Sequence, residues 1–130
     1  MKNKYLVNND GSITIFANCK GVIREIIIDK EDFSVINKAT NGSWYVKSAK
    51  GTLYALFCIR NKKENKKDVY VYMHRLIMKL IECEYDKVLK NTGLDLVVDH
   101  HPNHYGLDNR RNNLKVVTFI ENLKNRQKKK

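Results

Sequence analysis

Three polar residues near the C-terminus have the chemistry that phosphodiester hydrolysis requires. Asp99 and His100 follow the apolar run Leu94–Val98, and Asn122 comes 23 residues after Asp99. A carboxylate and an amide oxygen are hard ligands that suit Mg²⁺ or Mn²⁺. A neutral imidazole beside them can take a proton from an attacking water. We therefore predict one divalent-cation site, with Asp99 and Asn122 as ligands and a histidine as the general base.

The elements that must position these residues are a strand, a polar loop, a second strand and a helix. Leu94–Val98 and Leu114–Val117 predict two buried strands, and residues 99–113 between them are polar and loop-like. Thr118 and Glu121 stand at the spacing of a capping box, which predicts that a helix begins at Thr118. Such a ββα unit would turn the end of the first strand toward the helix, so that the two metal ligands point into one pocket.

The remainder of the chain predicts a β-rich layer and a packing helix. β-Branched and aromatic residues cluster over the first 72 residues, with turn signals between the clusters. Residues 73–83 carry apolar side chains at helical spacing. We expect an α+β fold in one compact domain, with an N-terminal antiparallel β-layer over 1–72 and a helix plus the ββα unit over 73–130. The expected strands are Ile13–Phe16, Val22–Ile28, Trp44–Val46, Thr52–Ile59 and Val69–Tyr72, with short helices over Glu31–Lys38 and 84–93.

The charge of the chain favours a polyanionic partner. Lysine and arginine number 25 against 14 aspartate and glutamate residues, which gives a net charge of +11. The excess is concentrated in residues 60–67 and 109–130. Basic blocks of this kind suit nucleic acid, although a solvated charged surface has the same composition.

Composition disfavours several other classes of protein. No run of about 18 apolar residues exists, and the first residues lack the apolar stretch of a signal peptide, so we expect a cytoplasmic protein without a membrane span. The three cysteines are scattered and form no C-x-x-C pair, which argues against a disulfide framework. His100, His101 and His104 lack a fourth zinc ligand at useful spacing. The scattered tyrosines form no stacking platform, which disfavours an RNA-binding module.

The segment VVDHHPNHYGLDNRRNNLKVVTFIENLKNR resembles the HNH, or ββα-metal, nuclease motif. It is most similar to the homing endonucleases of phages and introns. Leu107–Leu114 matches the LDNRxxNL stretch of such proteins, and Thr118–Asn122 matches their helix start. The stretch YMHRLIM at 72–78 also resembles one that precedes the motif in many of them. The likeness is strong over 69–126 and faint over 10–60.

The resemblance implies an endonuclease that uses one Mg²⁺ or Mn²⁺ ion per site to cut double-stranded DNA. By position, His100 would be the general base, and Asp99 and Asn122 the metal ligands. Asn113 would be a structural residue that pins the loop and orients the base. The gap from His100 to Asn113 is one residue longer than usual, and His101 fits the usual spacing. We favour His100 because it keeps its place beside Asp99 and because alternation would put His101 on the other face.

Basic residues in the loop, on the second strand and on the helix are expected to contact DNA phosphates, which positions the duplex without reading its sequence. A single site of this kind nicks one strand, so a double-strand break would require a homodimer or a second encounter. The main alternative is a DNA-binding protein that keeps the ββα shape and does not cut. The expected contact residues are Asn109, Arg110, Arg111, Lys115, Lys124 and Arg126, with Lys62 and Lys63 in the 60–67 loop.

Overall fold

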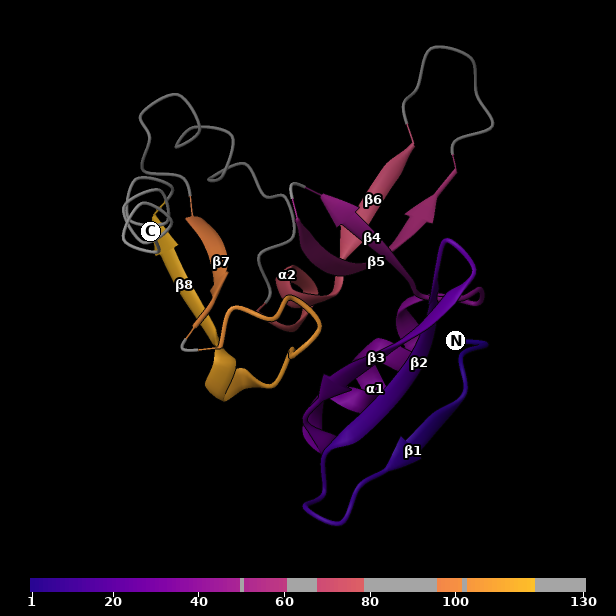
Figure 1. The fold of residues 1–130 in the computed structure, drawn as a ribbon, viewed down its shortest axis with the longest axis horizontal. Helices are drawn as coiled ribbons and strands as arrows, with labels where there is room; N and C mark the ends of the chain where they lie inside the picture. The colour runs from indigo at the N-terminus through magenta and orange to yellow at the C-terminus, as the bar shows by residue number, and fades with distance from the viewer. Residues whose placement is uncertain (50, 61–67, 79–95, 102, 119–130) are drawn as a thin grey trace.

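The computed structural model describes residues 1–49, 51–60, 68–78, 96–101 and 103–118, and these residues form a mixed α+β fold that is mostly strand (Figure 1). A six-stranded sheet has the order β1-β2-β4-β5-β6, and β3 pairs with the other side of β2. The strands of this sheet are β1 (Tyr5–Val7), β2 (Ile13–Cys19), β3 (Val22–Ile28), β4 (Tyr45–Ala49), β5 (Thr52–Ile59) and β6 (Val69–Tyr72).

The sheet follows the sequence pattern closely, with one departure in strand direction. The predicted strands that became β3, β5 and β6 are confirmed to the residue. Lys20 and Gly21, which join β2 to β3, have φ of 51° and 86°, the conformation of a two-residue hairpin turn. The expectation of a purely antiparallel layer is wrong, because β2 and β4 pair in parallel where Asn18 lies opposite Tyr45. The α1 segment between β3 and β4 provides the crossover that this parallel pair needs.

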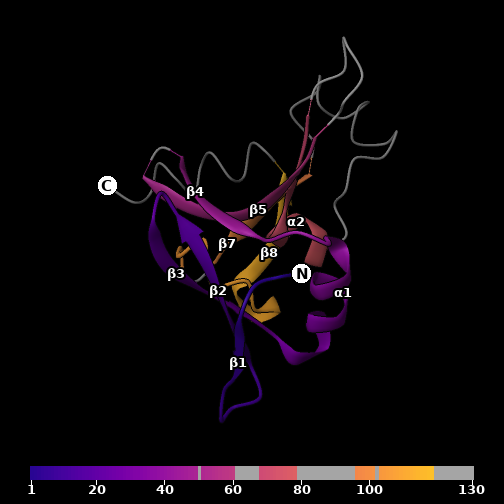
Figure 2. The same cartoon turned by 90° about the vertical axis from the view of Figure 1, so that its right-hand side faces the viewer.

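Two short helices pack beside each other against the sheet (Figure 2). The helix α1 (Phe33–Ala39) follows a 3₁₀ turn, η1 (Lys30–Asp32), and the helix α2 (Met73–Ile77) begins directly after β6. They bury Ile36 and Met73 in the same core as Trp44. The predicted continuation of α2 beyond Met78 and the predicted helix over 84–93 lie outside the described residues. Within the described part, no helix has the length and apolar character to cross a membrane.

A second, two-stranded sheet lies beside α2 and carries the residues of interest (Figure 1). It pairs β7 (Leu96–His100) with β8 (Leu114–Thr118) in antiparallel register, so that Asp99 lies opposite Lys115 and His100 opposite Leu114. Both strands were predicted, and β7 extends two residues beyond the expected end at Val98, while the first two residues of the prediction lie outside the described part of the chain. The loop between them closes with the 3₁₀ turn η2 (Arg111–Asn113). The helix predicted from Thr118 lies outside the described residues, and Thr118 itself ends β8.

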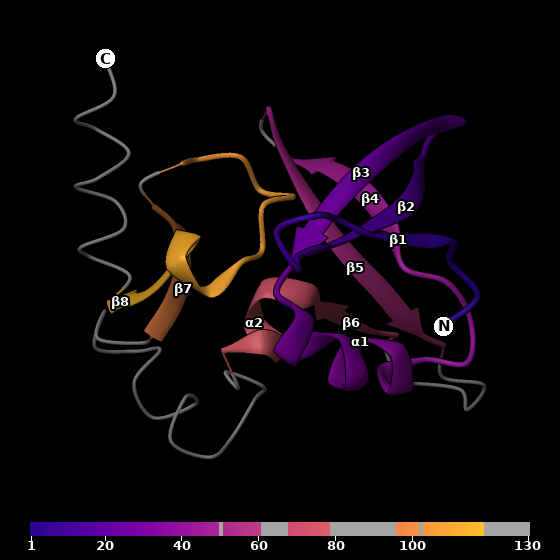
Figure 3. The ribbon, with the colours of Figure 1, turned by 90° about the horizontal axis from the view of Figure 1, so that it is seen from below.

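The loop between β7 and β8 is bonded to the free edge of β3 (Figure 3). The Ile27 N–H donates to the Leu107 carbonyl at 2.9 Å, and the Asn109 N–H donates to the Ile27 carbonyl at 2.8 Å. Leu107 is fully buried in the core of the main sheet. Gly106 runs so close to β5 that a Cβ at this position would overlap the Leu53 carbonyl oxygen. The hairpin and the N-terminal sheet therefore share one core and one hydrogen-bond network.

Candidate functional site

His100, the last residue of β7, is buried, and among the described residues its side chain is held by Asn109. Its Nε2 lies 2.8 Å from Asn109 Oδ1, and the side chain is 6% exposed. An amide oxygen only accepts, so Nε2 carries the hydrogen and Nδ1 keeps a lone pair. Burial lowers the pKa of His100, while the bond to Asn109 and the charges of Asp99 and Asp108 act in the opposite direction. The imidazole is therefore neutral near pH 7, which is the form that a general base requires.

Asn109 is the residue that orients His100. Its side chain is completely buried, and its backbone N–H is fixed by Ile27 on β3. Asn109 was expected to contact DNA, but a residue with no exposed surface cannot reach a duplex. Asn109 lies in the LDNR stretch that carried the resemblance, but its bond to His100 could not be predicted. The two residues are nine apart, and only the folded loop brings them together.

Asp99 presents a carboxylate oxygen that the described protein leaves without a partner. Its Oδ2 is buried and accepts no hydrogen bond from the described residues. Leaving a buried carboxylate oxygen unpaired is costly, so a cation or donor is expected to use it. A hard anionic oxygen of this kind suits Mg²⁺ or Mn²⁺. The second expected ligand, Asn122, lies outside the described residues, and within them no cluster of three His, Cys, Asp or Glu side chains could hold a metal.

Asp99 and His100 leave β7 on opposite faces, because side chains alternate along a strand. The cross-strand partners agree, since Lys115 opposite Asp99 is exposed whereas Leu114 opposite His100 is buried. The alternation that was expected to put His101 on the other face from His100 therefore puts Asp99 there as well. A substrate that used both side chains would have to lie across the end of β7, where the strand meets the loop.

Asn113 holds the loop together and is not bonded to His100 in the described structure. Its Oδ1 accepts from the Asn103 N–H at 2.7 Å, and its Nδ2 donates to the Asp108 carbonyl at 3.0 Å. Its own carbonyl accepts from the His101 N–H at 2.8 Å. These bonds are the loop-pinning geometry expected of Asn113, whereas the bond that orients the base comes from Asn109. His101 is exposed, with its ring near that of His104.

The two arginines of the loop are engaged in ion pairs within the protein. Arg110 Nε and Nη2 each lie 2.8 Å from a carboxylate oxygen of Asp108, and this pairing lowers the pKa of Asp108. Arg111 Nη2 lies 2.7 Å from Oδ1 of the buried Asp32, and its N–H donates to Asp29 at 2.8 Å. Arg111 thus ties the loop to η1 of the N-terminal part. Lys115 is exposed on β8, as a phosphate contact requires, and Lys62, Lys63, Lys124 and Arg126 lie outside the described residues.

Among the described residues, two of the buried side-chain atoms that lack a partner belong to residues whose side chains contact His100, and the third belongs to Asp99 on the other face of β7. They are His74 Nδ1, Asp99 Oδ2 and Asn109 Nδ2. Asp99 precedes His100 in the chain, Asn109 is bonded to it, and the ring centroid of His74 lies 5.0 Å from that of His100. Unpaired buried polar atoms are rare, and their concentration is typical of a functional site. His74 stands inside the YMHRLIM stretch that carried part of the resemblance.

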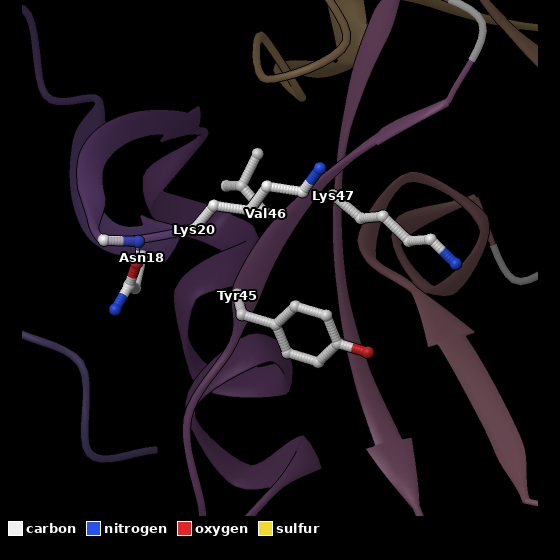
Figure 4. Close-up of a pocket in the computed structure, with 6 residues that line it drawn as sticks. Asn18, Lys20, Tyr45, Val46 and Lys47 are labelled. Atoms are coloured by element: carbon white, nitrogen blue, oxygen red, sulfur yellow. Dashed lines mark hydrogen bonds between the residues drawn. The ribbon is translucent and has the colours of Figure 1, made fainter.

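A shallow pocket of about 380 Å³ lies elsewhere, between the β2–β3 turn and β4 (Figure 4). Tyr45 and Lys47 point to one side of β4 and Val46 to the other, as expected of a strand. The lining contains no carboxylate and no histidine, so it offers neither a metal ligand nor a general base. The residues that line it are Asn18, Lys20, Gly21, Tyr45, Val46 and Lys47.

Comparisons of the chain with protein-family models, with curated proteins and with solved structures found no match. Functional inference for this protein therefore rests on its own residues and on their geometry. The most informative part of that geometry is the end of β7, where unpaired polar atoms lie on Asp99 and on the two residues whose side chains contact His100.

Proposed function

We propose that this protein is a divalent-metal-dependent DNA endonuclease of the HNH type. The observation that carries the proposal is that unpaired buried polar atoms lie at the end of β7, on Asp99 and on Asn109 and His74, the two residues whose side chains contact His100. The resemblance of 69–126 to homing endonucleases supports the same reading. The β7–β8 hairpin and the helix predicted from Thr118 would together form the ββα unit of that class.

The residues of the site divide the chemistry between them. Asp99, with Asn122, would hold the cation, which when bound would stabilise the charge on the phosphate and on the leaving oxygen. His100 takes a proton at Nδ1 from a water molecule, whose oxygen attacks the phosphorus as the P–O bond to the leaving oxygen breaks. Asn109 keeps the hydrogen of the neutral imidazole on Nε2, so that Nδ1 remains free for this proton. Asn113 holds the loop that carries Asn109.

Duplex DNA is the substrate that the charge of the chain favours. The net charge of +11 suits a polyanion, and the basic excess lies in 60–67 and in 109–130, which contains the second half of the motif. The charges of Arg110 and Arg111 are partly neutralised, because the two side chains form ion pairs with Asp108 and Asp32 respectively. We therefore assign the main phosphate contacts to Lys115, to the lysines of 60–67 and to the basic residues after Thr118.

A plasmid-nicking assay tests the proposal. Supercoiled plasmid is incubated with Mg²⁺ or Mn²⁺ and with wild type, His100→Ala, Asp99→Ala or His101→Ala, and binding to a DNA duplex is measured in parallel. We expect the wild type to nick, and the His100 and Asp99 variants to lose about 10²-fold or more of the rate while still binding. The His101 variant is the matched control and should keep nicking.

Each contrary outcome has a definite meaning. A wild type that binds the duplex and nicks with neither metal would contradict the proposal and leave a non-cutting DNA-binding protein. Loss of nicking in His101→Ala together with full activity in His100→Ala would move the general base to His101 and overturn the mechanism given for His100.

A further inference from the structure

The proposed base, His100, belongs to a cluster of four rings from four different elements, of which the rings of Tyr54 and His74 contact it directly. Tyr54 comes from β5, Tyr72 ends β6, His74 stands in the first turn of α2, and His100 ends β7. The ring centroid of His100 lies 5.0 Å from that of His74 and 6.4 Å from that of Tyr54. Tyr72 contacts the other two, at 5.8 Å from His74 and 6.0 Å from Tyr54. The N-terminal sheet therefore forms one wall of the His100 environment.

His74 is the member of this cluster whose presence packing alone does not explain. It is 7% exposed, and its Nδ1 has no hydrogen-bond partner among the described residues. Burial lowers its pKa to about 3, with the neighbouring His100 and Arg75 acting in the same direction, so the ring is neutral. A buried polar nitrogen without a partner destabilises the fold, whereas phenylalanine would fill a similar space without that cost. An imidazole at this position therefore needs a reason other than stability.

We infer that His74 is a positioning residue for His100. The inference rests on the proposed function, because it assigns His74 a role in that same site. Cβ and the bond from Nε2 to Asn109 hold the His100 imidazole at two points, and the ring can still turn about the line that joins them. The neutral imidazole of His74, at 52° to that of His100, limits this turning and sets the direction of His100 Nδ1 through its ring dipole and its unpaired Nδ1, both of which a phenyl ring lacks. A base must hold this direction to within a fraction of an ångström to reach its water.

The test compares His74→Phe with Tyr72→Phe. Both substitutions remove polar atoms from the same ring cluster, but the Tyr72 ring contacts Tyr54 and His74 rather than His100, so Tyr72 serves as the matched control. For His74→Phe we expect kcat for nicking to fall about tenfold or more, with KM and DNA affinity unchanged and with Tm equal to or above that of the wild type. Tyr72→Phe should leave kcat unchanged. Loss of activity at unchanged or raised stability is a result that a merely structural role would not give.

A second variant and a second measurement keep the inference testable. If His74→Phe does not fold, His74→Leu replaces it with the same expectations. Full kcat in either folded variant overturns the inference. NMR of the His100 imidazole gives a readout that does not depend on cleavage: its ring resonances should shift or broaden in the His74 variant and stay in place in Tyr72→Phe. Unchanged His100 resonances overturn the inference even if the wild type does not cut, whereas an inactive wild type alone contradicts only the proposed function.

Discussion

At the scale of single residues, the unpaired polar atoms of the candidate site lower the free energy of unfolding of the protein. The unpaired nitrogens of His74 and Asn109 and the unpaired oxygen of Asp99 each carry a desolvation cost of about 1–3 kcal/mol. The neutral state of His74 adds a pH dependence, because its pKa of about 3 in the folded protein is far below the ordinary value of 6.5. The unfolded chain therefore binds a proton at His74 before the folded protein does.

This difference predicts how stability changes with pH. The contribution of His74 is complete above pH 6.5 and is lost as the pH falls from 6.5 toward 3, at up to about 1.4 kcal/mol per pH unit. The His74→Phe variant lacks this loss, so its free energy of unfolding should fall less steeply between pH 6 and pH 4.5. Urea unfolding at several pH values measures both slopes. Parallel curves for wild type and variant would mean that His74 is not held neutral by the fold.

At the scale of elements, the strands of both sheets could be predicted from the sequence, whereas the bonds between distant residues could not. The strands of the main sheet follow local patterns, because β-branched runs between turn residues specify strands without knowledge of the rest of the chain. The hairpin of β7 and β8 could be predicted for the same reason. The bonds of Arg111 to Asp32 and of Asn109 to His100 could not, since each joins residues that only tertiary folding brings together.

Gly106 offers a direct test of how the loop is seated on the sheet. In Gly106→Ala the new Cβ would meet the Leu53 carbonyl, and backbone on both sides must shift. We expect a loss of about 1–3 kcal/mol in the free energy of unfolding and a loss of nicking, since Asn109 is carried on the same loop. Gly42→Ala is the control, because its Cβ would meet only the Thr40 hydroxyl at 3.6 Å, and it should change stability by less than about 0.5 kcal/mol. A Gly106 variant as stable and active as the wild type would contradict the close approach.

At the scale of the whole molecule, charge could be predicted from composition but its distribution over the surface could not. Arg110 and Arg111 were expected to contact phosphates, and the fold pairs both with carboxylates. The placement of Asp99 and His100 on opposite faces of β7 likewise could not be predicted, because the expected strand ended at Val98 and the observed strand reaches His100. Of the expected contact residues that the structure describes, Lys115 is exposed on β8.

The dependence of DNA binding on salt measures this distribution. If about six phosphates are contacted, the logarithm of the binding constant should fall with the logarithm of salt concentration with a slope of about −5. Replacing Lys62 and Lys63 together by alanine should make that slope shallower by about 2. Lys38→Ala on α1 lies outside the basic segments and should leave the slope unchanged. An unchanged slope in the double variant would remove the 60–67 segment from the DNA contacts.

The contact between the loop and β3 has a consequence for solubility. β3 pairs only with β2 among the described strands, and an outer strand with free N–H and C=O groups is a template on which another chain can add. Ile27 gives both of its backbone groups to the loop, at Leu107 and at Asn109. The loop that carries Asn109 therefore also covers part of the exposed edge of β3. A change that releases this loop would leave an inactive protein that is also prone to self-association.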